Sequence, residues 1–369
     1  MNKEKDIIAA IDIGTSKTVT IAGRCDNNGF PEILGLSRTD IKGFEKGIVI
    51  DKGEFINAVR LTVEEVQKQT GIEIREAYVG VAGLEIGYSL CTTFIMRSLT
   101  DDEISERDIE RLLGKAYNTS VSPGEEIYKI IPQSFTIDGE KDIRSPVGCN
   151  GLRFELVYGM FTDKTSTISL IRRLIEQLRI KVKETVLASV ASAYTVLTPE
   201  EIDGGVLLVD FGTDATDIVL IYYGQLKYVA ALSKLTTLSK SNDIIDALLP
   251  HFEISLFRDY VYGDIVLTGG GANQSNFQEI IKLKTGFNVR IAHPDIKVAA
   301  ESSFRVTFPE YSASIGLLQY GFTNLGPELV QKKNIINTSR IFNPEFLSFH
   351  NNPGSIRKLS RKKDFENAL

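Results

Sequence analysis

Two segments of the chain carry nearly the same residues, and in both an aspartate ends an apolar run. Asp12 opens the run Asp-Ile-Gly-Thr-Ser-Lys-Thr, and Asp210 opens the run Asp-Phe-Gly-Thr-Asp-Ala-Thr. The glycine after each aspartate lets the backbone turn with its N–H groups exposed. Such turns can cradle anions, and an aspartate beside them can hold a metal-bound water. The duplication therefore predicts a site that faces a polyphosphate and Mg²⁺ from two sides.

A third glycine-rich segment lies late in the chain. Residues 265–268 are predicted to be a buried strand, and Gly269, Gly270 and Gly271 follow it directly. Only glycine lets a flat ring or a phosphate approach the main chain so closely. A loop of glycines can also be a simple flexible turn, but its place behind a buried strand favours ligand binding.

Alternating strands and helices must position these three loops. Helices are predicted over 54–69, 164–178, 187–197 and 276–284, and a strand over 77–82, from the spacing of their apolar residues. Because the alternation surrounds two related halves, it predicts an α/β protein with two lobes and a cleft between them.

The pattern changes between about residues 84 and 161. Strand-like segments over 89–96, 127–137 and 152–161 flank an amphipathic helix, for which Thr100 to Glu103 is the predicted capping box. This region is predicted to be a compact α+β insertion.

Composition narrows the classes of function. A chain of 369 residues predicts two or three domains, and a net charge of −6 excludes the basic footprint of a nucleic-acid-binding protein. Three scattered cysteines support neither a disulfide framework nor a zinc site. The charged start lacks a signal-peptide stretch, and no apolar run approaches about 20 residues. We therefore expect a reducing compartment and no membrane-spanning segment.

With these motifs the chain resembles the actin-like ATPase superfamily and, within it, the FtsA family of bacterial cell-division proteins. Five elements match in the order of the superfamily: two phosphate motifs, two connecting helices and an adenosine motif. They are 12–18 and 210–217, 191–194 and 313–316, and 267–272. The segments that resemble the FtsA-specific 1C insertion are 78–83, 131–135, 137–139 and 144–148.

The resemblance implies an α/β, actin-like two-lobed fold with duplicated α/β domains and an FtsA-type 1C insertion. The implied divisions are 1–84 and 162–203 for subdomain 1A, 85–161 for the 1C-like insertion, 204–232 and 264–330 for subdomain 2A, 233–263 for a reduced 2B region, and 331–369 for a flexible basic tail. The 2B interval is much shorter than the family's.

The resemblance also implies ATP and Mg²⁺ as ligands. The expected nucleotide-binding residues are Asp12, Gly14, Thr15, Ser16, Lys17, Asp210, Gly212, Thr213, Thr216, Gly269, Gly270 and Gly271. Asp12 and Asp210 are expected to face the metal through water.

An FtsA-like protein is expected to self-associate into filaments and to bind the C-terminal tail of FtsZ. It is expected to be cytoplasmic, peripheral on the cytoplasmic face of the inner membrane at the division site. The basic residues of 355–363 are expected to bind anionic lipid by charge alone, since the apolar face there is fragmented.

Two departures from the family pattern concern catalysis. Thr213 and Asp214 stand where the family has glycines in the second phosphate loop, and Ala188 stands where the superfamily often has a glutamate that orients water. A methyl group cannot polarise water, so little or no ATPase activity is expected.

Two alternatives share the duplicated phosphate loops: a PilM-like pilus-assembly actin homologue, and a sugar- or acetate-kinase-type phosphotransferase. The 1C-like segments and the basic tail favour the FtsA resemblance over the first. A kinase needs a further acid/base group and, usually, larger insertions than this chain has.

Overall fold

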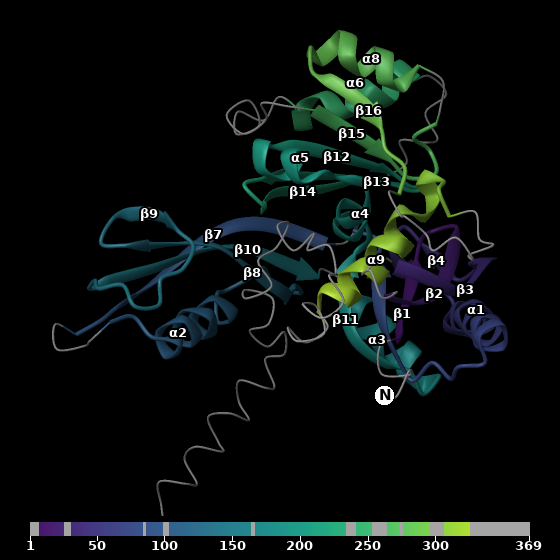
Figure 1. Ribbon diagram of the computed structural model, residues 1–369, viewed down its shortest axis with the longest axis horizontal. Helices are drawn as coiled ribbons and strands as arrows, with labels where there is room; N and C mark the ends of the chain where they lie inside the picture. The colour runs from purple at the N-terminus through teal and green to yellow at the C-terminus, as the bar shows by residue number, and fades with distance from the viewer. Residues whose placement is uncertain are drawn as a thin grey trace, which may run out of the picture. The chain divides into compact units, whose positions relative to one another are not determined.

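The computed structural model describes residues 7–25, 31–83, 86–98, 103–163, 167–233, 241–252, 264–273, 276–294 and 306–324. These residues fall into two compact units (Figure 1). One unit contains the described residues up to 86 and from 167 onward, and the other contains residues 87–163. The predicted basic tail, 331–369, lies outside the described residues.

The first unit contains a sheet of five strands in the order β11-β6-β1-β2-β3. The strands are β1 (Ile7–Ile13), β2 (Lys17–Cys25), β3 (Pro31–Asp40), β6 (Glu76–Val81) and β11 (Lys181–Leu187). β1 is antiparallel to β2 and parallel to β6, and β6 is parallel to β11. A short hairpin of β4 (Phe44–Glu45) and β5 (Ile48–Val49) follows β3.

A second sheet in the same unit repeats this arrangement. Its order is β14-β13-β12-β15-β16. The strands are β12 (Val206–Phe211), β13 (Ala215–Tyr222), β14 (Gln225–Ser233), β15 (Asp264–Thr268) and β16 (Asn288–Ile291). β12 is antiparallel to β13 and parallel to β15, as β1 is to β2 and β6. The duplicated α/β architecture predicted from the two aspartate motifs is confirmed.

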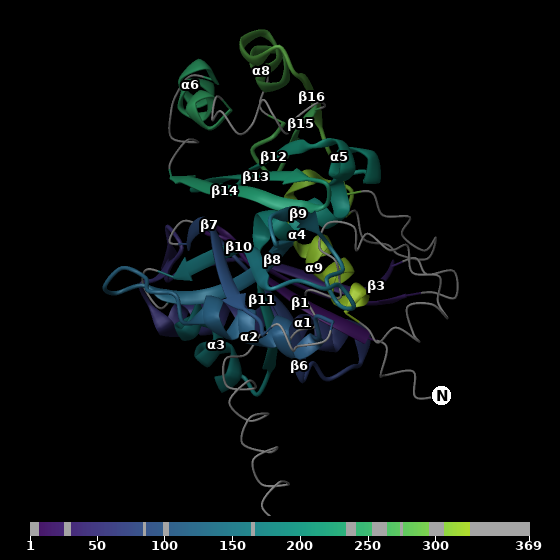
Figure 2. The same cartoon turned by 90° about the vertical axis from the view of Figure 1, so that its left-hand side faces the viewer.

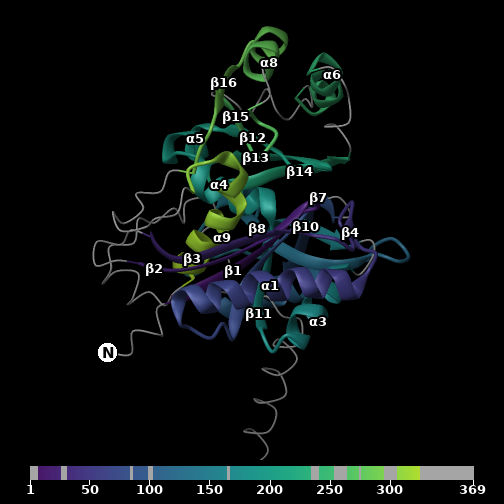
Figure 3. The same ribbon diagram turned by 90° about the vertical axis from the view of Figure 1, so that its right-hand side faces the viewer.

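Two helices cross between the sheets (Figures 1 and 3). α4 (Ala188–Val196) contacts β11, β12 and β13, whereas α9 (Ser312–Thr323) follows the short helix η3 (Pro309–Tyr311) and contacts β1, β2 and β6. They approach so closely at Gly316 that an added Cβ would lie 1.8 Å from the Ala191 carbonyl oxygen. This crossing fixes the ends of β1 and β12 near one another.

Other helices cover the outer faces of the sheets. Figure 3 shows α1 (Lys52–Thr70) on the side of the first sheet opposite α9, and α3 (Thr167–Gln177) contacts α1 and β11. Asp51 caps the start of α1, because its Oδ1 accepts hydrogen bonds from the N–H groups of Gly53 and Glu54. Gly71, in the left-handed region, caps the end of the helix.

The second sheet has its own core. α6 (Ser241–Phe252) and α8 (Phe277–Thr285) pack against it through Ile245, Leu248 and Phe277, all buried, and both helices lie on one side of the sheet in Figure 2. α5 (Pro199–Gly204) contacts β13. The sequence predicts a reduced 2B region over 233–263, and α6 is the one element described between the end of β14 and the start of β15.

The second unit is an α+β module. Its sheet has the order β7-β10-β8-β9. The elements are β7 (Ile86–Met96), α2 (Glu106–Tyr117), β8 (Glu126–Ile137), β9 (Glu140–Ile143) and β10 (Arg153–Asp163). Ile109, Leu112 and Phe135 are part of one buried cluster between helix and sheet. The predicted insertion pattern agrees with this module.

The start of α2 differs from the prediction. The observed capping box pairs Ser105 with Asp108, whereas Thr100 lies outside the described residues. Asp108 accepts hydrogen bonds from both the backbone N–H and the hydroxyl of Ser105. This capping box lies closer to the helix than the predicted box over Thr100 to Glu103. The helix therefore begins at Glu106.

Among the described helices, none combines the length and the apolar character that crossing a bilayer requires.

Candidate functional site

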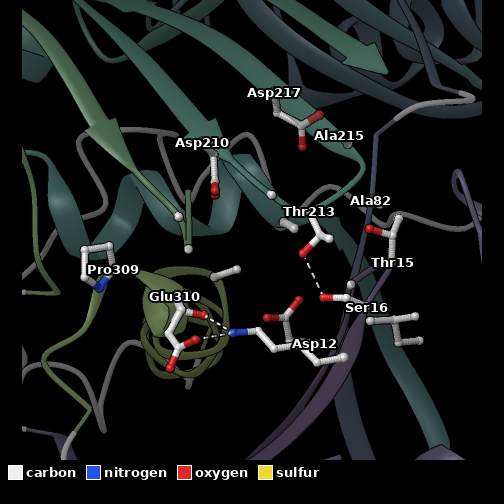
Figure 4. A pocket seen from close by; sticks show the side chains of 18 of the residues that line it. Asp12, Thr15, Ser16, Ala82, Asp210, Thr213, Ala215, Asp217, Pro309 and Glu310 are labelled. Atoms are coloured by element: carbon white, nitrogen blue, oxygen red, sulfur yellow. Dashed lines mark hydrogen bonds and ion pairs between the residues drawn. The ribbon is translucent and has the colours of Figure 1, made fainter. Parts of the chain in front are cut away.

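A cavity of about 280 Å³ lies where the two aspartate-bearing turns meet (Figure 4). All the predicted nucleotide-binding residues line it except Thr216 and Gly271. Thr216 is fully buried in β13, opposite Phe211, and the Gly271 N–H donates to the Phe211 carbonyl at 2.9 Å. These two residues shape the turns around the cavity, and the others contribute directly to its wall.

Each aspartate is held by a serine from one of the crossing helices. Ser314 of α9 donates to Asp12 Oδ2 at 3.0 Å, and Ser192 of α4 donates to Asp210 Oδ2 at 2.6 Å. One hydrogen bond to one carboxylate oxygen fixes the orientation of the group. The two halves of the site are therefore built alike, at the carboxyl ends of equivalent strands.

Burial makes these carboxylates unusually basic. Burial raises the pKa of Asp12, although the hydrogen bond from Ser314 and the charge of Lys17 oppose the rise. Burial, with the nearby charge of Asp12, raises the pKa of Asp210 to about 6. A third aspartate, Asp217 on β13, lines the same cavity, and burial with the charge of Asp210 raises its pKa to about 7.

This acid cluster fits a magnesium ion held through water. Mg²⁺ takes oxygen ligands and usually keeps several of its waters. Asp217 is 7% exposed, and the nearby Ser189 hydroxyl lowers its pKa against the larger effect of burial, so the cluster holds a third buried carboxylate. No group of three or more His, Cys, Asp or Glu side chains in the described ranges is arranged to ligate a metal directly. Contact of Asp12 and Asp210 with a metal ion through water stays a prediction.

Glycines let the backbone of the turns pack closely against neighbouring parts of the chain. A Cβ on Gly212 would lie 2.8 Å from the Ala215 carbonyl oxygen, and one on Gly269 would lie 2.3 Å from Asp210 Oδ1. Gly269 also has a φ of +87°, which side-chain-bearing residues rarely adopt. Gly270 differs, because an added Cβ would have the Glu310 Cβ as its nearest neighbour at 3.7 Å. A larger residue there would enter the cavity without disturbing the backbone.

Thr213, Asp214 and Ala188, the residues that depart from the family pattern, differ in whether they line the cavity. Thr213 lines the cavity and its hydroxyl lies 2.8 Å from that of Ser16, so the two phosphate turns touch through side chains. Asp214 is not among the lining residues, so the side chain that enters this space is that of Thr213. Ala188, at the start of α4, does line the cavity and presents only a methyl group.

Sequence reasoning did not identify Arg38, Asp217 and Glu310 as site residues, although all three line the cavity. Asp217 closes the second phosphate motif, so its spacing from Asp210 was an available signal. Arg38 and Glu310 lie in no motif. They reach the site only because β3 and η3 come together in the fold.

The duplicated sheets around this cavity have the actin-like ATPase fold. A solved structure titled "PilM-PilN type IV pilus biogenesis complex" is similar to it with a TM-score of 0.61 at 14% identity, covering 85% of this chain and 98% of that one. Within that fold class the chain is FtsA-like. Residues 91–162 match the family described as "SHS2 domain inserted in FTSA".

Curated relatives support the same resemblance. Cell division protein FtsA of Pseudomonas aeruginosa is 31% identical over 226 residues, 61% of this chain and 54% of the relative. FtsA of Buchnera aphidicola is 24% identical over 404 residues, 91% of this chain and 95% of the relative. In the Pseudomonas aeruginosa and Escherichia coli matches, the chain spans about half the length of the relative. The predicted resemblance to FtsA is confirmed.

Proposed function

We propose that the chain is an actin-like cell-division protein that binds ATP with Mg²⁺ in the cavity between its two sheets. The observation that carries the proposal is the pair of serine-held aspartates, Asp12 and Asp210, which face one cavity from equivalent strand ends. The open glycine turns beside them suit the backbone contacts that phosphates need.

Magnesium would be held through water by Asp12 and Asp210, with Asp217 beside them. When bound, it neutralises charge on the phosphates. The chain's own residues do the rest of the binding. The turn from Gly14 to Lys17 holds the β- and γ-phosphates, and the loop from Gly269 to Gly271 receives the adenosine.

Binding is tested by Gly270→Val, which fills the cavity at a position where a Cβ has room in the protein alone. ATP should raise the unfolding temperature of the unmodified chain and not that of the variant, because a ligand stabilises only the state that binds it. The two proteins should unfold at similar temperatures without ATP. Equal ATP-dependent shifts would show that the loop does not contact the nucleotide.

ATP acts here as a conformational ligand, and its hydrolysis is very slow or absent. Ala188 leaves an attacking water without a side chain to orient it, and Thr213 narrows the second phosphate turn. Steady-state phosphate release measures this, with Asp12→Ala as the control for contaminating activity. Turnover of about 1 per second that disappears in the control would refute the proposal, since ordinary enzymes work at that rate.

We further propose that the chain self-associates into filaments and binds the C-terminal tail of FtsZ, which it would tether to the cytoplasmic face of the inner membrane at the division site. The similarity to FtsA over 91% of the chain and the SHS2 match support this role. Residues 85–161 would provide a filament contact. Electron microscopy should show filaments for the full chain with ATP and none after deletion of that segment, and persistent filaments would contradict the assignment.

A further inference from the structure

Two cations of the first lobe converge on one carboxylate at the cavity. Lys17 Nζ lies 3.2 Å from Glu310 Oε2 and also donates to the Glu310 carbonyl oxygen at 3.0 Å. Arg38 Nη1 lies 3.0 Å from the same carboxylate oxygen. Lys17 is in the first phosphate turn, Arg38 is on β3, and Glu310 is in η3, immediately before α9.

Glu310 lies on the route between the phosphate turn and the adenosine loop. Its side chain faces the cavity in Figure 4, joined by the dashed contacts to the lysine ammonium. Gly270 also lies close to Glu310, since a Cβ built there would be 3.7 Å from the Glu310 Cβ. A nucleotide with its phosphates on Lys17 and its adenosine on Gly270 would therefore pass Glu310.

The charges that line the cavity make the position of Glu310 important for the entry of a polyphosphate. The ionisable side chains that line the cavity are Asp12, Asp210, Asp217 and Glu310, with Lys17 and Arg38 as the cations. While Glu310 holds both cations, its carboxylate compensates one of their two positive charges, so an entering polyphosphate meets less positive charge beside the buried aspartates. Phosphate oxygens and ionised carboxylates brought close together repel one another, and more strongly where water is excluded.

We propose that Lys17 and Arg38 form a two-cation clamp for the terminal phosphates of a nucleotide, and that Glu310 occupies this clamp until the phosphates replace it. This inference rests on the proposed nucleotide function and adds Arg38 and Glu310 to its site. A guanidinium fork binds two phosphate oxygens as well as it binds a carboxylate. The Arg38 and Glu310 side chains are 40% and 30% exposed and that of Lys17 is 17% exposed, so the carboxylate they share is open to solvent and can exchange for another anion.

The proposed replacement of the Glu310 carboxylate by phosphates predicts which class of ligand binds best. A nucleoside triphosphate carries charge enough to displace the carboxylate, a diphosphate carries less, and adenosine carries none. Glu310 therefore favours the triphosphate indirectly, because only a strong anion gains more from the two cations than the carboxylate does. Inorganic triphosphate shares the chemistry but lacks the adenosine that would contact Gly270.

The test is Glu310→Gln, titrated with ATP, inorganic triphosphate and adenosine at a fixed Mg²⁺ concentration. Two partly exposed ion pairs contribute about 0.2–1 kcal/mol each, so the variant should bind ATP and inorganic triphosphate about 2- to 30-fold more tightly. Adenosine affinity should not change. Arg38→Ala, which leaves Glu310 in place, should weaken ATP about 3- to 10-fold and leave adenosine unchanged.

Glu64→Gln is the matched control. Glu64 pairs with Arg60 at 2.8 Å on α1 and does not line the cavity, so the same change of carboxylate to amide should leave all three affinities unchanged. ATP affinity that is equal to or below the original in Glu310→Gln overturns the inference, while the proposed function stands if Gly270→Val abolishes binding. Failure of the unmodified chain and every variant to bind ATP overturns both.

Discussion

Asp217 should destabilise the folded chain as the pH rises, and Asp217→Asn should remove that effect. Its folded pKa is about 7 because burial and the charge of Asp210 disfavour ionisation, whereas the ordinary pKa of an aspartate side chain is 3.8. The folded state therefore holds the proton more tightly than the unfolded chain. Stability from this group is greatest below about pH 4, falls as the pH rises, and is constant again above about pH 7.

The magnitude follows from the difference in pKa. A folded pKa higher by about 3 corresponds, at about 1.4 kcal/mol for each pH unit, to about 4 kcal/mol of free energy of unfolding lost between about pH 4 and pH 8. Ionisation of Asp210 shares the same pocket, so the measured loss from Asp217 should be about 2–4 kcal/mol. Asparagine keeps the shape and carries no charge.

Urea unfolding at several pH values between 4.5 and 8 measures the effect. The free energy of unfolding of Asp217→Asn relative to the original chain should grow by about 2–4 kcal/mol toward pH 8. Asp214→Asn is the control, because Asp214 is in the same turn but does not line the cavity. A difference between Asp217→Asn and the original that stays constant with pH would refute the reasoning.

Three further predictions concern the crossing helices, the missing water-orienting group and the tail. Gly316→Ala should push α4 and α9 apart and so lower the free energy of unfolding by about 1–3 kcal/mol in urea titrations. Gly114→Ala is the control: an added Cβ there meets nothing on α2, so the free energy of unfolding should rise by about 0.4–1 kcal/mol. Ala188→Glu should increase steady-state phosphate release, and no increase would show that water orientation is not what limits hydrolysis. Vesicles of anionic lipid should co-sediment with the chain at about 0.01 M salt and much less at about 0.15 M, and removal of residues 355–369 should abolish binding. Salt-independent binding would contradict the charge-only interaction.

Local signals predicted most of the fold. The residues around Asp12 and Asp210 end buried strands and begin glycine turns, so sequence spacing alone indicated both hairpins and their duplication. The helices over 54–69 and 187–197 were evident from apolar spacing and agree with α1 and α4. The cap of α2 was misplaced, since Ser105 and Asp108 offer the same chemistry as the predicted box nearer the helix.

Long-range contacts limited what the sequence could show of the site. Arg38 and Glu310 meet across a separation of 272 residues, and neither stands in a motif. Nor could spacing show that the serines of the connecting helices hold the two aspartates, because that depends on how α4 and α9 cross. The burial of Asp217 beside Asp210 is likewise a property of packing.

The most direct test of the account is a calorimetric titration of the full chain with ATP, in Mg²⁺ and then in excess chelator. We predict one saturable site per chain, weakened at least 10-fold by removal of Mg²⁺ and abolished by Gly270→Val, because the buried aspartates repel phosphate unless a cation lies between them. No heat of binding in Mg²⁺, or binding that Gly270→Val leaves unchanged, would contradict the assignment of this cavity as a nucleotide site.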